Sequence, residues 1–74
     1  MTMLQSRLRP QVFPEGVLEL MKPGCYYGAH AIVEIYRQRG ILVERWSVKS
    51  ALAVLERSGK ITRRRDGAFT RTPS

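Results

Sequence analysis

Cysteine is nearly absent from the chain, which has 74 residues and a single cysteine, Cys25. One cysteine excludes an internal disulfide, and no second cysteine is available to form the usual pair of zinc ligands. The chain also lacks an apolar run near the roughly 18 residues that a membrane-spanning helix needs. Its N-terminus lacks the continuous apolar stretch of a secretory signal. We therefore expect a cytoplasmic protein with no membrane partner, no bound metal and no cofactor.

Acidic residues are also few compared with basic ones. Six Asp and Glu face thirteen Lys and Arg, which gives a formal net charge of +7, and ten of the thirteen cations are arginine. The planar guanidinium of arginine matches phosphates and the edge of guanine. The charge therefore favours a polyanionic partner, with nucleic acid ahead of a membrane surface. A basic chain that is merely soluble is the alternative.

Groups that would carry out catalysis are also scarce. The sequence has no glycine-rich phosphate loop and no paired carboxylates. A nucleophilic pair of Cys25 and His30 is conceivable, but no third residue to orient it and no oxyanion site can be named. We therefore expect a binding protein and not an enzyme.

A chain of this length forms one domain with a small core. Hydrophobic residues make up 43% and charged residues 26%, as in ordinary globular proteins. We assign residues 13–74 to the domain and residues 1–12 to an N-terminal arm. The arm either frays or packs Val12 and Phe13 on the domain.

Periodicity predicts two helices in the first half of the domain. Pro14 suits the first position of a short helix, which ends before Pro23. A second helix begins between Tyr27 and His30 and ends at Gly40. The segment 41–45, ILVER, follows and is predicted to form a short strand.

A third helix is predicted from Ser47 to Ser58, with Ser47 as its N-cap and Gly59 after its end. Trp46, just before it, is expected to fill the core beside the helix, with stacking on a nucleic-acid base as the alternative. The helix carries a regular apolar stripe. This stripe consists of Val48, Ala51, Leu52 and Leu55.

Residues 60–72 are predicted to form a β-hairpin. A two-residue turn would place Ile61 and Phe69 on opposite faces, whereas a three-residue loop at residues 65–67 places both on one face. Both side chains can reach the core only in the second register. We therefore predict the three-residue loop, with Gly67 in the left-handed conformation that such loops require.

The stretch SVKSALAVLERSGKITRRRDGAFTRT resembles the winged helix-turn-helix family. In that family an apolar stripe on the recognition helix ends in a leucine, here Leu55. A charged pair, a glycine and an apolar residue follow, here at Glu56-Arg57, Gly59 and Ile61, and lead into a basic wing. The resemblance implies an α+β fold of three helices and a C-terminal β-hairpin wing. The link 40–46, GILVERW, replaces the short turn that usually precedes the recognition helix.

Such a domain would insert the third helix into the major groove of double-stranded DNA and hold the backbone or minor groove with the arginine wing. The third helix presents small and basic side chains opposite its apolar stripe, and the wing adds four arginines. The predicted DNA-binding residues are Arg45, Ser47, Lys49, Ser50, Ala53, Arg57, Arg63, Arg64, Arg65 and Arg71. Each group also has a plainer interpretation, as an exposed helix face or as charge that deters edge-to-edge strand pairing.

Two functions from different classes follow. The first is a small bacterial or phage regulator of transcription that binds duplex DNA and is associated with the nucleoid when bound. The alternative is a winged helix that binds protein, as an adaptor or antagonist of a larger nucleic-acid enzyme, because fold alone does not determine function. A homodimer is compatible with either function, and RNA is a weaker candidate ligand.

Overall fold

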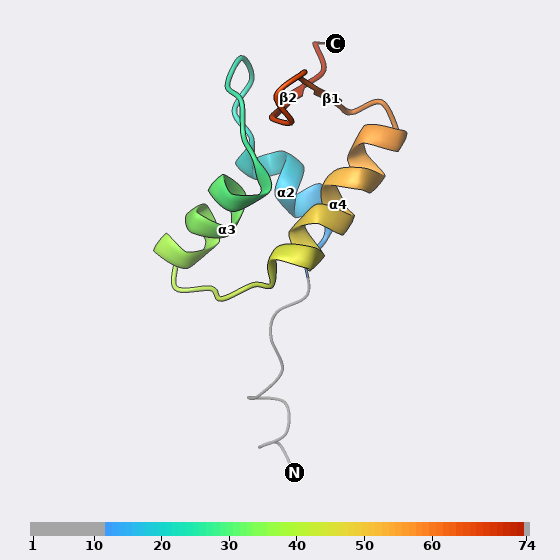
Figure 1. The fold of residues 1–74 in the computed structure, drawn as a ribbon. Helices are drawn as coiled ribbons and strands as arrows, with labels where there is room; N and C mark the ends of the chain where they lie inside the picture. Colours follow the sequence, from blue (N-terminus) through green and yellow to red (C-terminus); the bar gives the residue numbers. More distant parts are fainter. Residues whose placement is uncertain (1–11, 74) are drawn as a thin grey trace.

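The computed structural model of the chain describes residues 12–73 (Figure 1). Within this range, three helices precede a two-stranded antiparallel hairpin, so the predicted α+β layout is confirmed. The elements are α2 (Pro14–Leu20), α3 (Ala29–Gln38), α4 (Arg45–Arg57), β1 (Ile61–Arg63) and β2 (Phe69–Arg71). None of these helices has both the length and the apolar character that crossing a bilayer requires.

The first two helices begin and end where the sequence predicted. Pro14 occupies the start of α2, where its missing N–H costs nothing. The α3 helix begins at Ala29, within the predicted window, and the chain leaves it through Gly40 at φ +80°. A side chain at that φ would be strained, which explains why glycine stands there.

The predicted strand at residues 41–45 is wrong. Residues 41–44 form an irregular link without helix or strand. The backbone N–H of Ile41 donates a hydrogen bond to the Tyr36 carbonyl at 2.9 Å. A strand needs a partner, and this link lies at the far end of α4 from the hairpin (Figure 1). Apolar composition alone therefore could not make it a strand.

The predicted start of the third helix and the predicted place of Trp46 are also wrong. The helix begins at Arg45, and Glu44 takes the N-cap position without a side-chain capping hydrogen bond. Ser47 consequently lies in the first turn, where its N–H donates to the Glu44 carbonyl at 3.1 Å. The earlier start turns Trp46 outward, and 69% of its surface is exposed.

The hairpin has the predicted register. Arg63 pairs with Phe69 and Ile61 with Arg71, and Gly67 has φ +95°. The N–H of Gly67 donates to the Arg64 carbonyl at 2.9 Å, which closes the loop. Ile61 and Phe69 are both buried, as the choice of a three-residue loop required.

A third segment pairs with the hairpin. The N–H of Tyr27 donates to the Phe69 carbonyl at 2.8 Å, and the N–H of Phe69 donates to the Tyr27 carbonyl at 2.7 Å. This pairing fastens β2 to the chain between α2 and α3. It occupies the edge of β2 that does not pair with β1.

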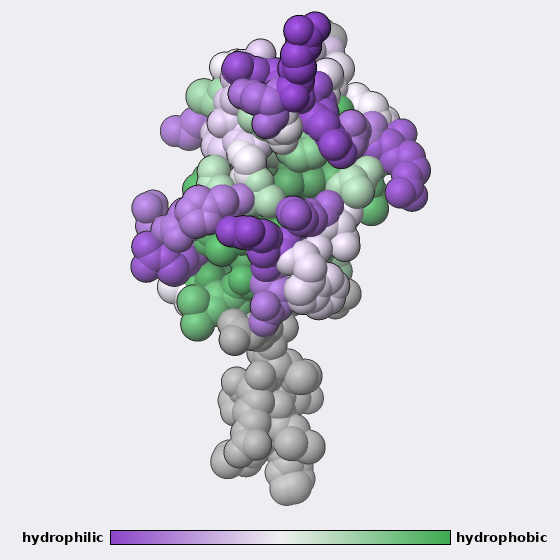
Figure 2. Space-filling view, viewed as in Figure 1, coloured by the Kyte–Doolittle hydropathy of each residue, from purple (hydrophilic) through white to green (hydrophobic). Residues whose placement is uncertain are grey.

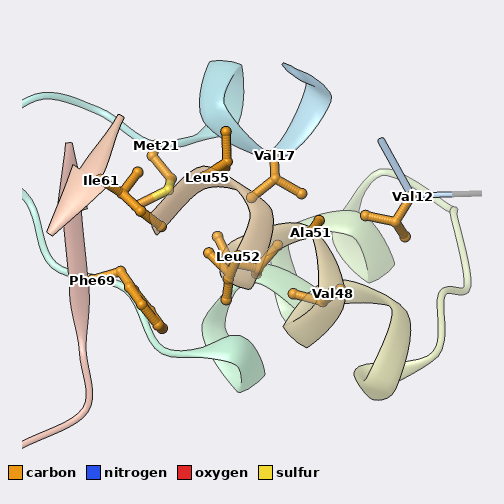
Figure 3. Close-up of a cluster of buried hydrophobic side chains, with 10 residues drawn as sticks. Val12, Val17, Met21, Val48, Ala51, Leu52, Leu55, Ile61 and Phe69 are labelled. Carbon is orange, nitrogen blue, oxygen red and sulfur yellow. The ribbon is translucent and has the colours of Figure 1, made fainter. Parts of the chain in front are cut away.

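One apolar cluster holds the elements together (Figure 3). Four of its side chains come from one face of α4, and the hairpin closes the cluster with Ile61 and Phe69. Val12, which the sequence assigned to the arm, also belongs to it. The members are Val12, Val17, Met21, Ile32, Val48, Ala51, Leu52, Leu55, Ile61 and Phe69.

Leu52→Ala tests which face of α4 is buried. Leu52 is 1% exposed, so truncation removes core contacts and leaves a cavity. We expect a loss of about 2–5 kcal/mol in the free energy of unfolding, which is close to the whole stability of a small domain. Thermal or urea unfolding measures it. Val54→Ala, on the same helix but 44% exposed, is the matched control and should change stability by less than about 0.5 kcal/mol. Equal losses in the two variants would contradict the assigned face.

Candidate nucleic-acid interface

The buried stripe of α4 determines which side chains face outward. Since an α-helix repeats every 3.6 residues, the face opposite the stripe centres on Trp46, Ala53 and Arg57, with Lys49 and Ser50 beside them. Lys49 and Ser50 are exposed and Ala53 is half-buried. The predicted face of small and basic residues is therefore present, with an exposed tryptophan at its N-terminal end.

The hairpin borders this helix face. A groove of about 340 Å³ lies between α4 and the hairpin. Lys49, Ala53, Arg63 and Gly67 are among the residues that line it. The structure thus brings the helix residues and the hairpin residues of the predicted site onto one surface. In Figure 2 hydrophilic side chains cover the hairpin end of the molecule and its middle, with apolar surface between them.

The three consecutive arginines of the hairpin have different environments. Arg63 contacts a side chain of α4. Its Nη2 donates to Glu56 Oε1 at 3.0 Å, and its guanidinium lies 5.2 Å from the centre of the Phe69 ring. Because β1 alternates, Arg63 points to the same side of the hairpin as Ile61. Its charge is directed at α4 and is partly neutralised by Glu56.

Arg64 points to the other side of the hairpin. Its guanidinium stacks 4.3 Å from the centre of the Tyr26 ring, and its Nη2 lies 3.3 Å from Asp66 Oδ2. Asp66 also accepts a hydrogen bond from the Ala68 N–H at 3.1 Å, so its carboxylate supports the turn.

Arg65 lies in the loop of the hairpin and is exposed. Among residues 12–73 it has no hydrogen bond, ion pair or ring contact. Its guanidinium is therefore fully available to an anionic ligand. Lys49 on α4 is exposed and equally without an ion-pair partner in this range.

Arg71 has a structural contact. It is half-buried, and its Nη1 donates to the Met21 carbonyl at 3.3 Å, just after the end of α2. A cation at this end of a helix is favoured by the helix dipole. The contact joins β2 to α2, and in this conformation the Arg71 side chain is directed at the protein.

The remaining predicted residues of α4 are Arg45, Ser47 and Arg57, and none of them lines the groove. Arg45 and Arg57 are exposed in the first and last turns. Ser47 is half-buried and stands two turns before Val54, on the edge of α4 that faces α2. Whether any of the ten residues contacts DNA stays a prediction.

Sequence reasoning missed the partners of these cations. Glu56 and Arg63 are seven residues apart, and Tyr26 and Arg64 are 38 apart, so no helical or strand periodicity links either pair. The register of the hairpin, which places Arg64 opposite Ala68, was the one signal that could have shown which side Arg64 takes.

The conceivable catalytic pair gains no support. Cys25 and His30 are both exposed, and no hydrogen bond joins them in the described part of the chain. In the same part, no three His, Cys, Asp or Glu side chains gather in a group that could hold a metal ion.

Comparisons with protein-family models, with curated proteins and with solved structures found no match for the chain.

Arg71→Ala and Arg65→Ala test whether Arg71 stabilises the fold while Arg65 does not. Loss of the half-buried hydrogen bond to Met21 should cost about 1 kcal/mol and lower the melting temperature by about 4–8 °C. Arg65 makes no contact in the described residues, so its removal should leave the melting temperature unchanged. Scanning calorimetry at one pH and salt concentration compares them. Equal melting temperatures for the two variants would contradict a structural role for Arg71.

Proposed function

We propose that the domain is a winged helix that binds double-stranded DNA, with the outward face of α4 in the major groove and the hairpin loop against the adjacent backbone or minor groove. One observation carries the proposal: Lys49 and Ala53 of α4 border the same groove as Arg63 and Gly67 of the hairpin. A helix face that reads bases and a basic loop that holds phosphates must lie side by side to engage one duplex.

Side-chain size and charge support this geometry. A major groove about 12 Å wide accepts one α-helix. Ser50 and Ala53 are small, and Lys49 can reach a base edge or a phosphate. Lys49 and Arg65 have no ion-pair partner in the described residues, so both can displace counterions from DNA at little internal cost.

The biological role follows from the resemblance of α4 and the hairpin to winged helix-turn-helix regulators. We propose a cytoplasmic protein, not an enzyme, that regulates transcription by occupying or shaping a DNA site. Direct contacts from Lys49 and Ser50 would select the sequence, and the hairpin would add affinity that is independent of sequence.

A second candidate function rests on one specific observation. Leu42, in the link before α4, and Trp46, in the first turn of α4, are 59% and 69% exposed. Large apolar side chains exposed in one part of a surface can mark a protein-binding site. The alternative is therefore an adaptor or antagonist that binds a larger nucleic-acid enzyme through the N-terminal end of α4.

The arginines of the hairpin loop give the first test. If they contact phosphates, Arg64→Ala combined with Arg65→Ala should weaken binding to all duplexes by similar factors. Each lost phosphate contact should reduce the slope of log K against log salt by roughly 0.9. The measurement is a fluorescence-anisotropy titration over a salt series, with Arg37→Ala combined with Arg39→Ala at the C-terminal end of α3 as a charge-matched control. Unchanged affinity and slope in the hairpin variant would refute the wing.

The face of α4 should determine sequence preference. Lys49→Ala combined with Ser50→Ala should change which duplexes a random-pool selection recovers, because residues in the major groove read base edges. A bidentate contact discriminates by about 1–3 kcal/mol, and lysine and serine should give less. An identical recovered motif for wild type and variant would argue against α4 as the reading helix.

Trp46 separates the two candidate functions, because it is the only tryptophan of the chain. If α4 faces DNA, adding duplex should change the emission of Trp46 with the same midpoint as the anisotropy titration. The hairpin double variant should shift both midpoints together. A saturating anisotropy change without any change in Trp46 emission would place the DNA elsewhere and leave the start of α4 to a protein partner.

A further inference from the structure

Arg64 lies closer to an aromatic ring than either neighbour does: its guanidinium is 4.3 Å from a ring centre, against 5.2 Å for Arg63. The ring belongs to Tyr26, which lies between α2 and α3, far from the hairpin in sequence. Tyr26 is itself half exposed, at 50%, so the stack lies at the surface of the molecule.

The pairing of Tyr27 with Phe69 explains why Tyr26 is in this place. Because side chains alternate along an extended segment, Tyr27 turns to the core and Tyr26 turns to the outer side of the hairpin. Arg64 is on that side too, since it follows Arg63, which points to α4. The backbone hydrogen bonds at 2.8 and 2.7 Å therefore set the ring under the guanidinium.

The loop that carries Tyr26 is closed at both ends. The N–H of Cys25 donates to the Lys22 carbonyl at 3.2 Å, and the N–H of Lys22 donates to the Tyr27 hydroxyl at 2.9 Å. Gly24 makes the bend between them at φ +83°. The ring of Tyr26 is thus supported by a braced turn.

A guanidinium that meets the face of a ring can still donate its N–H groups to an anion. In Arg64, Nη2 lies 3.3 Å from Asp66 Oδ2, and the guanidinium has no other ion pair and no hydrogen bond within the described residues. A guanidinium held in this way loses less conformational freedom when it binds a phosphate than the unsupported side chain of Arg65 does.

We propose that Tyr26 is a positioning residue for DNA binding, which orients Arg64 so that the two form one phosphate-binding unit on the outer side of the hairpin. This inference rests on the proposed function, and it extends the interface from α4 and the hairpin to the loop between α2 and α3. The ligand of the unit is a phosphate of the DNA backbone beyond the groove that α4 enters.

A double-mutant cycle tests the unit. Affinity for a labelled duplex of mixed sequence is measured over a salt series for wild type, Tyr26→Ala, Arg64→Ala and the double variant. Tyr26→Ala should weaken binding about two- to fivefold, as an exposed cation–π contact predicts. Adding it to Arg64→Ala should cause no further loss. Tyr26→Phe keeps the ring and should bind as wild type does, whereas Tyr26→Leu keeps bulk without a π face and should bind as Tyr26→Ala does.

Arg65 supplies the matched control, because it is adjacent to Arg64 and touches no ring in the described residues. In a second cycle, the effects of Tyr26→Ala and Arg65→Ala should multiply. A direct readout needs no DNA: ring-current shifts of the Arg64 side-chain protons in NMR spectra should disappear in Tyr26→Ala and persist in Tyr26→Phe. Melting temperatures confirm that all variants are folded.

The outcomes separate this inference from the function on which it rests. If wild type binds duplex with a steep salt dependence but Tyr26 and Arg64 act independently, the unit is refuted and DNA binding stands. An unchanged affinity in Tyr26→Ala refutes it equally. If wild type binds no duplex at low salt, the proposed function fails and the unit fails with it.

Discussion

The reciprocal backbone pairing of Tyr27 with Phe69 is the constraint on which the rest of the structure depends. It fastens a short hairpin, which would be marginal alone, to the chain between two helices. With β2 fixed, Phe69 enters the core beside Leu52, and Ile61 follows on β1. Alternation along β1 determines which side of the hairpin Arg63 and Arg64 occupy, and the pairing of Tyr27 places Tyr26 on the side of Arg64. The position of the hairpin, which contributes to both the core and the candidate interface, therefore depends on this pairing.

The hairpin shows how much a short sequence can determine. Alternation of Ile61 and Phe69, with a glycine at the one position that needs positive φ, was enough to predict its register. The apolar stripe of α4 was predictable for the same reason, because a local period decides which residues are buried. Local rules failed at residues 41–46, because a strand forms only where a partner strand lies within reach. Besides β1, the segment that pairs with β2 is Tyr27, whereas residues 41–44 form an irregular link and α4 begins at Arg45 with Trp46 exposed.

The sequence shows how many charged side chains the hairpin carries, and the structure shows which of them have partners. The run Arg63 to Arg65 reads as a uniform basic patch, yet one arginine faces Glu56, one stacks on Tyr26 and one has no partner in the described residues. These contacts join positions that no helical or strand period relates, so they become visible only in three dimensions. The predicted site thus divides into residues that hold the hairpin, such as Arg71, and residues that are available to a ligand, such as Lys49 and Arg65.

The central claim is that α4 and the hairpin loop meet one duplex together. NMR chemical-shift mapping during a titration with a short duplex tests it most directly. The account predicts that the backbone amide shifts gather on the outward face of α4 and on residues 64–67, while the C-terminal end of α3, near the exposed Arg37 and Arg39, stays unperturbed. Shifts confined to α3, or spread evenly over all basic residues, would contradict it.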